Sequence, residues 1–129
     1  MIPEYSALVS AILVQIVSIA VTGRQMNLEF GARYNAGPRD EPQQMSARLG
    51  RLRRATDNGF EGLVMFAPAV LMVGLTGQST ILTAVAAWAY VAARLLYIPA
   101  YAFGWTPGRS IIWSAGFLAT LVLLVSILL

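Results

Sequence analysis

The chain contains 129 residues, of which 57% are hydrophobic and 12% are charged, and its nine arginines and six carboxylates give a net charge of +3. Soluble globular domains contain about 25% charged residues, so this composition is typical of an integral membrane protein. Histidine and cysteine are both absent, which excludes disulfides, a cysteine nucleophile, and metal sites or catalytic triads that depend on histidine.

The first apolar stretch, residues 5–23, contains no charged residue and is about as long as the ~20 residues that a bilayer-spanning helix needs. Pro3 lies just before it and suits the first turn of a helix. The N-terminus has neither the basic region nor the small-residue cleavage site of a signal peptide, so we expect the stretch to remain as a first helix over residues 4–24. Its one amide, Gln15, suits an interhelical hydrogen bond.

The segment between residues 24 and 54 is polar and contains seven of the nine arginines. Within it, residues 35–42 combine asparagine, glycine, aspartate and two prolines, which indicates turns and a loop. Short arginine-rich loops stay on the cytoplasmic side of a membrane, so we expect the first helix to run from outside to inside. The basic excess thus reflects membrane topology, and we predict no nucleic-acid partner.

The next apolar stretch, residues 62–93, contains no charged residue and is too long for a single span. Residues 76–79, a glycine among three polar residues, interrupt it. We therefore expect two helices, over 50–75 and 79–102, joined by a tight outer turn. Pro68 would lie inside the first of these helices, where a membrane helix tolerates proline.

A last break is predicted over residues 103–108, which include two glycines and a proline. The uncharged stretch that follows, 110–129, predicts a fourth helix over 109–129. The predicted fold is therefore an all-α integral membrane four-helix bundle that forms one domain, residues 1–129, with both termini outside.

Polar side chains form two predicted stripes at the inner face. They recur at positions 51, 54, 58 and 61 of the second helix and at 94, 97 and 101 of the third, and spacings of three and four place each set on one helix face. The topology brings both stripes to one depth, together with the end of the first helix and the start of the fourth. The candidate site residues at this depth are Arg24, Arg54, Asn58, Glu61, Arg94, Tyr97, Tyr101 and Arg109. Asp57 is interpreted as solvated or paired with a lipid headgroup.

The chemistry of this set indicates a ligand. Arginines can hold carboxylates in bidentate fashion, Glu61 can accept from an ammonium group, and Asn58 can both donate to and accept from a peptide. The complementary ligand is small and zwitterionic, and a cationic neighbour would favour the thiolate of any thiol that it contains. The structural alternative is that the arginines anchor helices by snorkelling, with Glu61 paired to Arg54 or Arg94.

Two of these motifs resemble a known family. Residues 54–61, Arg-Ala-Thr-Asp-Asn-Gly-Phe-Glu, are followed by Phe66 and Pro68 and resemble the R-A-x-x-N-x-x-E signature of the MAPEG family, the membrane-associated proteins in eicosanoid and glutathione metabolism. Residues 94–101 resemble the R-x-x-Y-x-x-x-Y pattern in the third helix of that family. The resemblance in length, number of spans and order of motifs covers essentially the whole chain.

The resemblance implies a homotrimer that binds glutathione between neighbouring subunits near the cytoplasmic face, with no metal. Arg24 would reach a carboxylate of glutathione, and Arg109 would stabilise its thiolate. A lipophilic second substrate would enter from the bilayer, so the implied activity is that of a glutathione-dependent membrane transferase or peroxidase. The further glutathione contacts implied are Arg54, Asn58, Glu61, Tyr97 and Tyr101.

Two departures from the family pattern motivate an alternative. Gly62 stands where family enzymes often have asparagine or tyrosine, and Arg109 is about one residue out of register from Tyr101. The alternative is a non-catalytic lipid-binding or scaffold membrane protein on the same fold. A transporter or channel subunit is a third hypothesis, against which stands the lack of an internal repeat. The use of arginine alone as the basic residue and the short chain suggest a bacterial inner membrane.

Overall fold

The computed structural model describes residues 1–106 and 108–129, and this part of the chain contains helices and no strands. Four of the helices are long and apolar enough to cross a membrane, which confirms the predicted all-α fold with four spans. Pro107, part of the break predicted over 103–108, lies outside the described residues. The helices are α1 Pro3–Phe30, α2 Ala32–Ala36, α3 Ala47–Leu75, α4 Ile81–Ala102 and α5 Gly108–Leu128.

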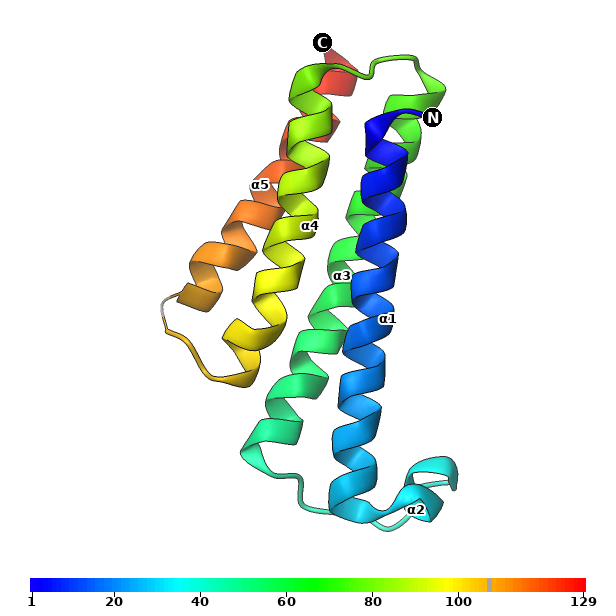
Figure 1. The fold of residues 1–129 in the computed structure, drawn as a ribbon, viewed down its shortest axis with the longest axis vertical. Helices are drawn as coiled ribbons and strands as arrows, with labels where there is room; N and C mark the ends of the chain where they lie inside the picture. Colours follow the sequence, from blue (N-terminus) through cyan, green and yellow to red (C-terminus); the bar gives the residue numbers. More distant parts are fainter. Residues whose placement is uncertain (107) are drawn as a thin grey trace.

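The four long helices form one bundle, with both chain termini at one end and α2 at the other (Figure 1). Helix α1 packs against α3 and α4, and α5 packs against α4 and α3. In the described part of the chain, α1 and α5 make no contact with each other. Helices α3 and α4 are therefore central, and the polar stripes of the sequence lie on these two helices.

Helix α1 extends beyond the predicted end at residue 24 and continues to Phe30. The extra turns are polar, and Gln25 Nε2 donates to Glu29 Oε2 one turn later, over 2.8 Å. The helix ends at Gly31, whose φ of 88° lies in the region that favours glycine. A hydropathy argument measures where the apolar span ends, whereas the helix continues until the backbone turns, which explains the difference.

Helix α3 begins at Ala47, three residues before its predicted start at 50. Ser46 caps it, because its side chain accepts from the backbone N–H of Leu49 over 3.0 Å. Glu29 of α1 holds this cap in place, since its Oε1 accepts from Ser46 N over 3.0 Å and its Oε2 from Ser46 Oγ over 2.6 Å. The polar segment is thus largely helical at both ends, with only the middle forming α2 and a loop.

A polar seam joins α1 to α3. Gln15 Nε2 donates to the backbone oxygen of Thr56 over 2.9 Å, which confirms the interhelical hydrogen bond predicted for this amide. Gly59 makes the contact possible, because a Cβ there would lie 2.0 Å from Gln15 Oε1. The hydroxyl of Ser18 adds a hydrogen bond to Thr56 Oγ1 over 2.8 Å. This seam fixes the rotation of α3 and turns its stripe of site residues away from α1.

A second polar contact holds the opposite end of the bundle. Glu4 is fully buried, and each of its carboxylate oxygens accepts from Ser79 Oγ over 3.0 Å. Thr83, in the first turn of α4, also donates to this carboxylate. The contact ties the start of α1 to the start of α4.

Candidate functional site

A polar pocket opens between α3, α4 and α5 near the turn that joins α4 to α5. Its volume is about 410 Å³, within the ~300–1,000 Å³ range of small-molecule sites. It contains six of the eight candidate residues and one further carboxylate. We call it the polar pocket, and the residues that line it are Arg54, Asp57, Asn58, Glu61, Tyr97, Tyr101 and Arg109.

Tyr101 lies between two arginines from different helices. Arg54 Nε of α3 donates to Tyr101 Oη over 3.0 Å. The guanidinium carbon of Arg109, in the first turn of α5, lies 4.8 Å from the centre of the same ring, within the range of a cation–π contact. Arg109 therefore joins the site despite its shift in register, because the start of α5 at Gly108 brings it next to Tyr101.

Arg94 lies behind the polar pocket and does not line it. Its side chain is 8% exposed, and its Nη1 donates to Asn58 Oδ1 over 2.8 Å. Its guanidinium carbon lies 4.4 Å from the centre of the Tyr97 ring. Arg94 thus orients two residues of the pocket. Because the Asn58 oxygen accepts from Arg94, the Nδ2 amide is the group that Asn58 can offer to a ligand.

The structural alternative was an ion pair between Glu61 and either Arg54 or Arg94. Both arginines make other contacts instead. Arg54 hydrogen-bonds to Tyr101, and Arg94 to Asn58. Glu61 is exposed along the pocket wall. A carboxylate in this position within an apolar helix is a candidate ligand group rather than a packing element.

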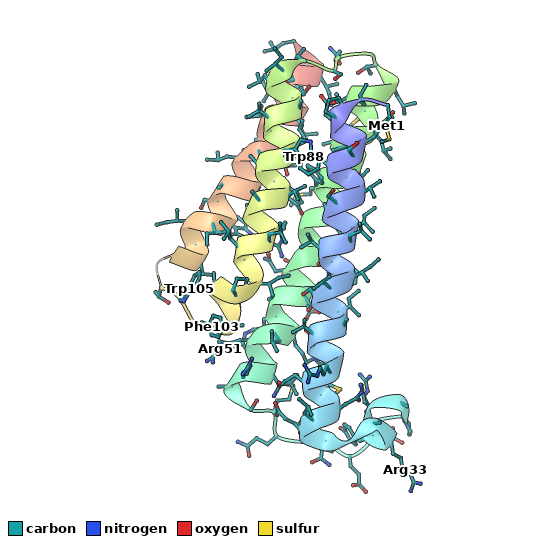
Figure 2. The ribbon with its side chains drawn as sticks, in the orientation of Figure 1. Met1, Arg33, Arg51, Trp88, Phe103 and Trp105 are labelled. Atoms are coloured by element: carbon teal, nitrogen blue, oxygen red, sulfur yellow. The ribbon has the colours of Figure 1, made fainter. Side chains whose placement is uncertain are left out.

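Two other arginines lie outside the polar pocket, one from the candidate set and one from the predicted stripe on the second helix. Arg24 is exposed on α1 and does not line the polar pocket. Arg51, which belongs to the stripe on α3, donates from Nε to the backbone oxygen of Ala102 over 3.0 Å. Figure 2 shows Arg51 beside the α4–α5 turn, near Phe103 and Trp105. Arg51 therefore satisfies a carbonyl at the end of α4, where a cation is also favourable to the helix dipole.

Asp57, interpreted from the sequence as solvated or paired with a lipid headgroup, is exposed and also lines the polar pocket. Asp57 follows Arg54 by three residues and precedes Glu61 by four. These are the spacings of one helix face, so periodicity could have found it. The pocket consequently has two carboxylates, at Asp57 and Glu61, beside two arginines, Arg54 and Arg109.

Gly62 is explained by Tyr90 of the neighbouring helix. A Cβ on Gly62 would lie 2.6 Å from Tyr90 Oη, so the tyrosine hydroxyl occupies the space that a side chain would need. The Tyr90 ring stacks on Phe66, with centroids 3.8 Å apart and planes 8° apart. Sequence reasoning missed Tyr90, although it precedes Arg94 by four residues and so extends the stripe on α4.

Tyr90 also faces a second cavity, which we call the apolar cavity. Its volume is about 60 Å³, and it lies between α3, α4 and α5. It shares Asn58 and Glu61 with the polar pocket, and its other walls combine buried residues with the exposed side chains of Met65, Trp113 and Phe117. The residues that line it are Asn58, Glu61, Gly62, Met65, Tyr90, Ala93, Arg94, Ile112, Trp113, Gly116, Phe117 and Thr120.

The hydroxyl of Tyr90 is buried without a hydrogen-bond partner in the described part of the chain. Tyr90 is 3% exposed. A buried unsatisfied polar group costs ~1–3 kcal/mol, so a hydroxyl in this state is a feature that requires an explanation.

Comparison with known proteins adds one finding. The model of the MAPEG family matches residues 4–129. No curated protein and no solved structure matches the chain. The matched range includes both stripes and all four long helices.

Proposed function

The chain belongs to the MAPEG family, and from this premise we propose that it is a glutathione-dependent membrane transferase or peroxidase that acts on lipophilic electrophiles. Family membership and four membrane-spanning helices make it a membrane protein related to glutathione or eicosanoid metabolism. The specific activity is our proposal, and the composition of the polar pocket is the observation that supports it.

Several residues of the polar pocket are chemically complementary to groups of glutathione. Glutathione has two carboxylates, one ammonium group, two peptides and a thiol. Arg54 lines the pocket, and its planar guanidinium suits bidentate contact with a carboxylate. The carboxylates of Asp57 and Glu61 suit the ammonium group. The Nδ2 amide of Asn58 remains available for a peptide oxygen.

Arg109 is the proposed catalytic residue. Its guanidinium lies on the Tyr101 ring at the side where α5 meets the polar pocket. A permanently charged neighbour favours the thiolate over the thiol, and the thiolate is the nucleophile. A lipophilic electrophile that enters from the bilayer would meet the thiolate beside α5, so proximity supplies part of the rate.

The homotrimer implied by the family resemblance remains part of the proposal. Arg54, Asp57 and Glu61 are exposed on α3 in a single subunit, and exposed charges in an apolar helix are costly unless something covers them. Arg24 is exposed on α1 and does not line the polar pocket of one subunit. Its predicted role therefore needs a neighbouring subunit. We place the arginine-rich segment 24–54 on the cytoplasmic side of a bacterial inner membrane.

Calorimetry on the detergent-purified protein tests the proposal. We expect wild type to bind glutathione, and we expect Arg54→Ala and Glu61→Ala each to weaken binding at least tenfold, since charged contacts contribute ~1.5–3 kcal/mol. Arg33→Ala is the matched control, because it removes the same charge from α2, and no residue of α2 lines the polar pocket.

Two outcomes would contradict the proposal. If folded wild type does not bind glutathione, the non-catalytic lipid-binding or scaffold protein becomes the better hypothesis, and lipid should then copurify. If Arg33→Ala weakens binding as much as Arg54→Ala does, the binding is general charge attraction and does not involve the polar pocket.

A further inference from the structure

A third pocket lies at the end of the bundle that carries α2 (Figure 1), between α1, α2, the loop that follows α2, and α3. Its volume is about 310 Å³, within the ~300–1,000 Å³ range of small-molecule sites. It shares no lining residue with the polar pocket. We call it the loop pocket, and its walls include Met26, Phe30, Tyr34, Arg39, Met45 and Arg53.

The loop between α2 and α3 is fastened at both ends by contacts within the chain. After α2, Tyr34 Oη donates to the backbone oxygen of Glu41 over 2.6 Å. Before α3, the backbone N–H of Ser46 donates to Glu29 Oε1 over 3.0 Å. The walls of the loop pocket are therefore held without a ligand, as is usual for small-molecule sites.

Arg39 has a fixed backbone and a fixed side chain. With a φ of 58°, it is the one non-glycine residue in the described part of the chain whose φ is positive, a conformation that is unfavourable for most side chains. Its guanidinium donates from Nε to the backbone oxygen of Asn35 over 2.9 Å and from Nη2 to Asn35 Oδ1. These bonds use two of the five N–H donors of the group, which leaves donors for a ligand. Strained residues of this kind are frequent in ligand clamps.

Arg53 supplies a second guanidinium, from α3. Its Nη1 donates to Met45 Sδ over 3.6 Å, and a thioether is only a weak acceptor. Among the described residues, no carboxylate lines the loop pocket. Two permanent positive charges thus line one pocket whose walls do not neutralise them. Because guanidinium groups bind phosphate oxygens in bidentate fashion, the loop pocket suits a phosphate.

Part of the wall of the loop pocket is apolar. Met26 is buried, and the rings of Phe30 and Tyr34 meet edge to face, with centroids 5.5 Å apart. An inorganic anion would leave this surface uncovered, whereas an amphiphile would cover it. The pocket therefore suits a phosphate that is attached to apolar groups.

The depth of the loop pocket indicates the source of such a molecule. The apolar stretch of α1 ends at residue 23, so Met26 and Phe30 lie about 5 and 10 Å beyond it at a rise of ~1.5 Å per residue. The polar layer on each side of a bilayer is about 5–8 Å thick, and lipid phosphates lie in this layer. The loop pocket is thus at the depth of the lipid headgroups.

We propose that the loop pocket binds the phosphate of an anionic phospholipid. Arg39 and Arg53 hold the phosphate oxygens, while Phe30 and Tyr34 contact the glycerol and the first carbons of the acyl chains. The inference does not depend on glutathione binding, because the two pockets have no lining residue in common. Its consequence is that the protein selects anionic lipid from its surroundings.

Native mass spectrometry of the detergent-purified full chain tests the site. We would titrate dioleoylphosphatidylglycerol, which is anionic, and dioleoylphosphatidylcholine, which has no net charge. Wild type should bind the anionic lipid more tightly. Arg39→Asn and Arg53→Gln should each weaken phosphatidylglycerol binding about fivefold, the contribution of one arginine at an anionic lipid surface. The double variant should bind the two lipids equally well.

Arg48→Gln is the matched control, because Arg48 is exposed on α3 and does not line the loop pocket. Asparagine adopts a positive φ more readily than most residues, so Arg39→Asn keeps the loop backbone, and Arg53→Gln changes no residue of the loop. If Arg48→Gln weakens phosphatidylglycerol binding as much as the pocket variants do, general charge attraction explains the binding and the inference is overturned. Equal affinity of wild type for the two lipids would also overturn it.

A soluble phosphate distinguishes the two sources of the same chemistry. We expect that sn-glycerol 3-phosphate, at the concentration of the lipid, leaves phosphatidylglycerol bound to wild type, because it does not cover the apolar wall formed by Phe30 and Tyr34. Displacement of the lipid at equal concentration would assign the loop pocket to a soluble phosphate compound and would overturn the lipid as its ligand.

Discussion

Gly62 and Tyr90 show how the space between two neighbouring helices is divided between their side chains. A side chain on α3 at position 62 would compete with the Tyr90 hydroxyl for the same space. The Tyr90 hydroxyl of α4 therefore occupies the space that a side chain at position 62 of α3 would need.

At the same scale, Arg109 should affect chemistry more than binding. If its guanidinium stabilises the thiolate, Arg109→Ala should lower kcat by ~100-fold, the effect of losing one group that stabilises developing charge. The Kd of glutathione should change by less than tenfold, because Arg54 and the pocket carboxylates remain. Single-turnover kinetics beside calorimetry measure both quantities. A variant with normal kcat would exclude Arg109 from catalysis.

Arg109→Lys is the informative comparison. Lysine keeps the positive charge but cannot lie flat on the Tyr101 ring as a planar guanidinium does. A rate that recovers only in part would indicate that position as well as charge matters.

The contact between α1 and α3 gives a prediction for a whole element. In Gly59→Ala, the new Cβ would lie 2.0 Å from Gln15 Oε1, so the two helices must separate or the amide must leave Thr56. We expect a loss of stability of ~1–3 kcal/mol, typical of overpacking. Unfolding in mixed detergent, followed by circular dichroism, measures it.

The double variant Gly59→Ala with Gln15→Ala is the control for this prediction. Removing the amide makes room for the new methyl group, so part of the lost stability should return relative to Gly59→Ala alone. If the two substitutions simply add, the clash between these residues is not the cause.

The sequence predicted the helices and most of the polar pocket because both depend on periodicity. The spacing of Arg54, Asn58 and Glu61 places them on one helix face wherever that helix packs. Arg94, a candidate site residue, lies behind the pocket in contact with Asn58 and Tyr97, and spacing alone could not tell which side chain of a stripe lines the pocket. The pairing of Gly62 with Tyr90 could not be predicted, because it depends on the distance between two helices.

At the scale of the molecule, the proposed homotrimer predicts a mass. We expect the purified protein to have the mass of three 13.9 kDa chains in native mass spectrometry. The reason is that charged residues of α3 are exposed in one subunit and a neighbour would cover them. A monomer across the accessible concentration range would contradict the trimer and leave Arg24 without a role in the site.

The buried carboxylate of Glu4 has a consequence for how the protein is made. Its partners Ser79 and Thr83 follow it by 75 and 79 residues in the chain, so they are synthesised long after α1 has reached the bilayer. Until α4 inserts, the carboxylate has to remain at the membrane surface in contact with water, because an unpaired charge in lipid is costly. The start of α1 is therefore the first part of the bundle to be synthesised and among the last to be fixed in place.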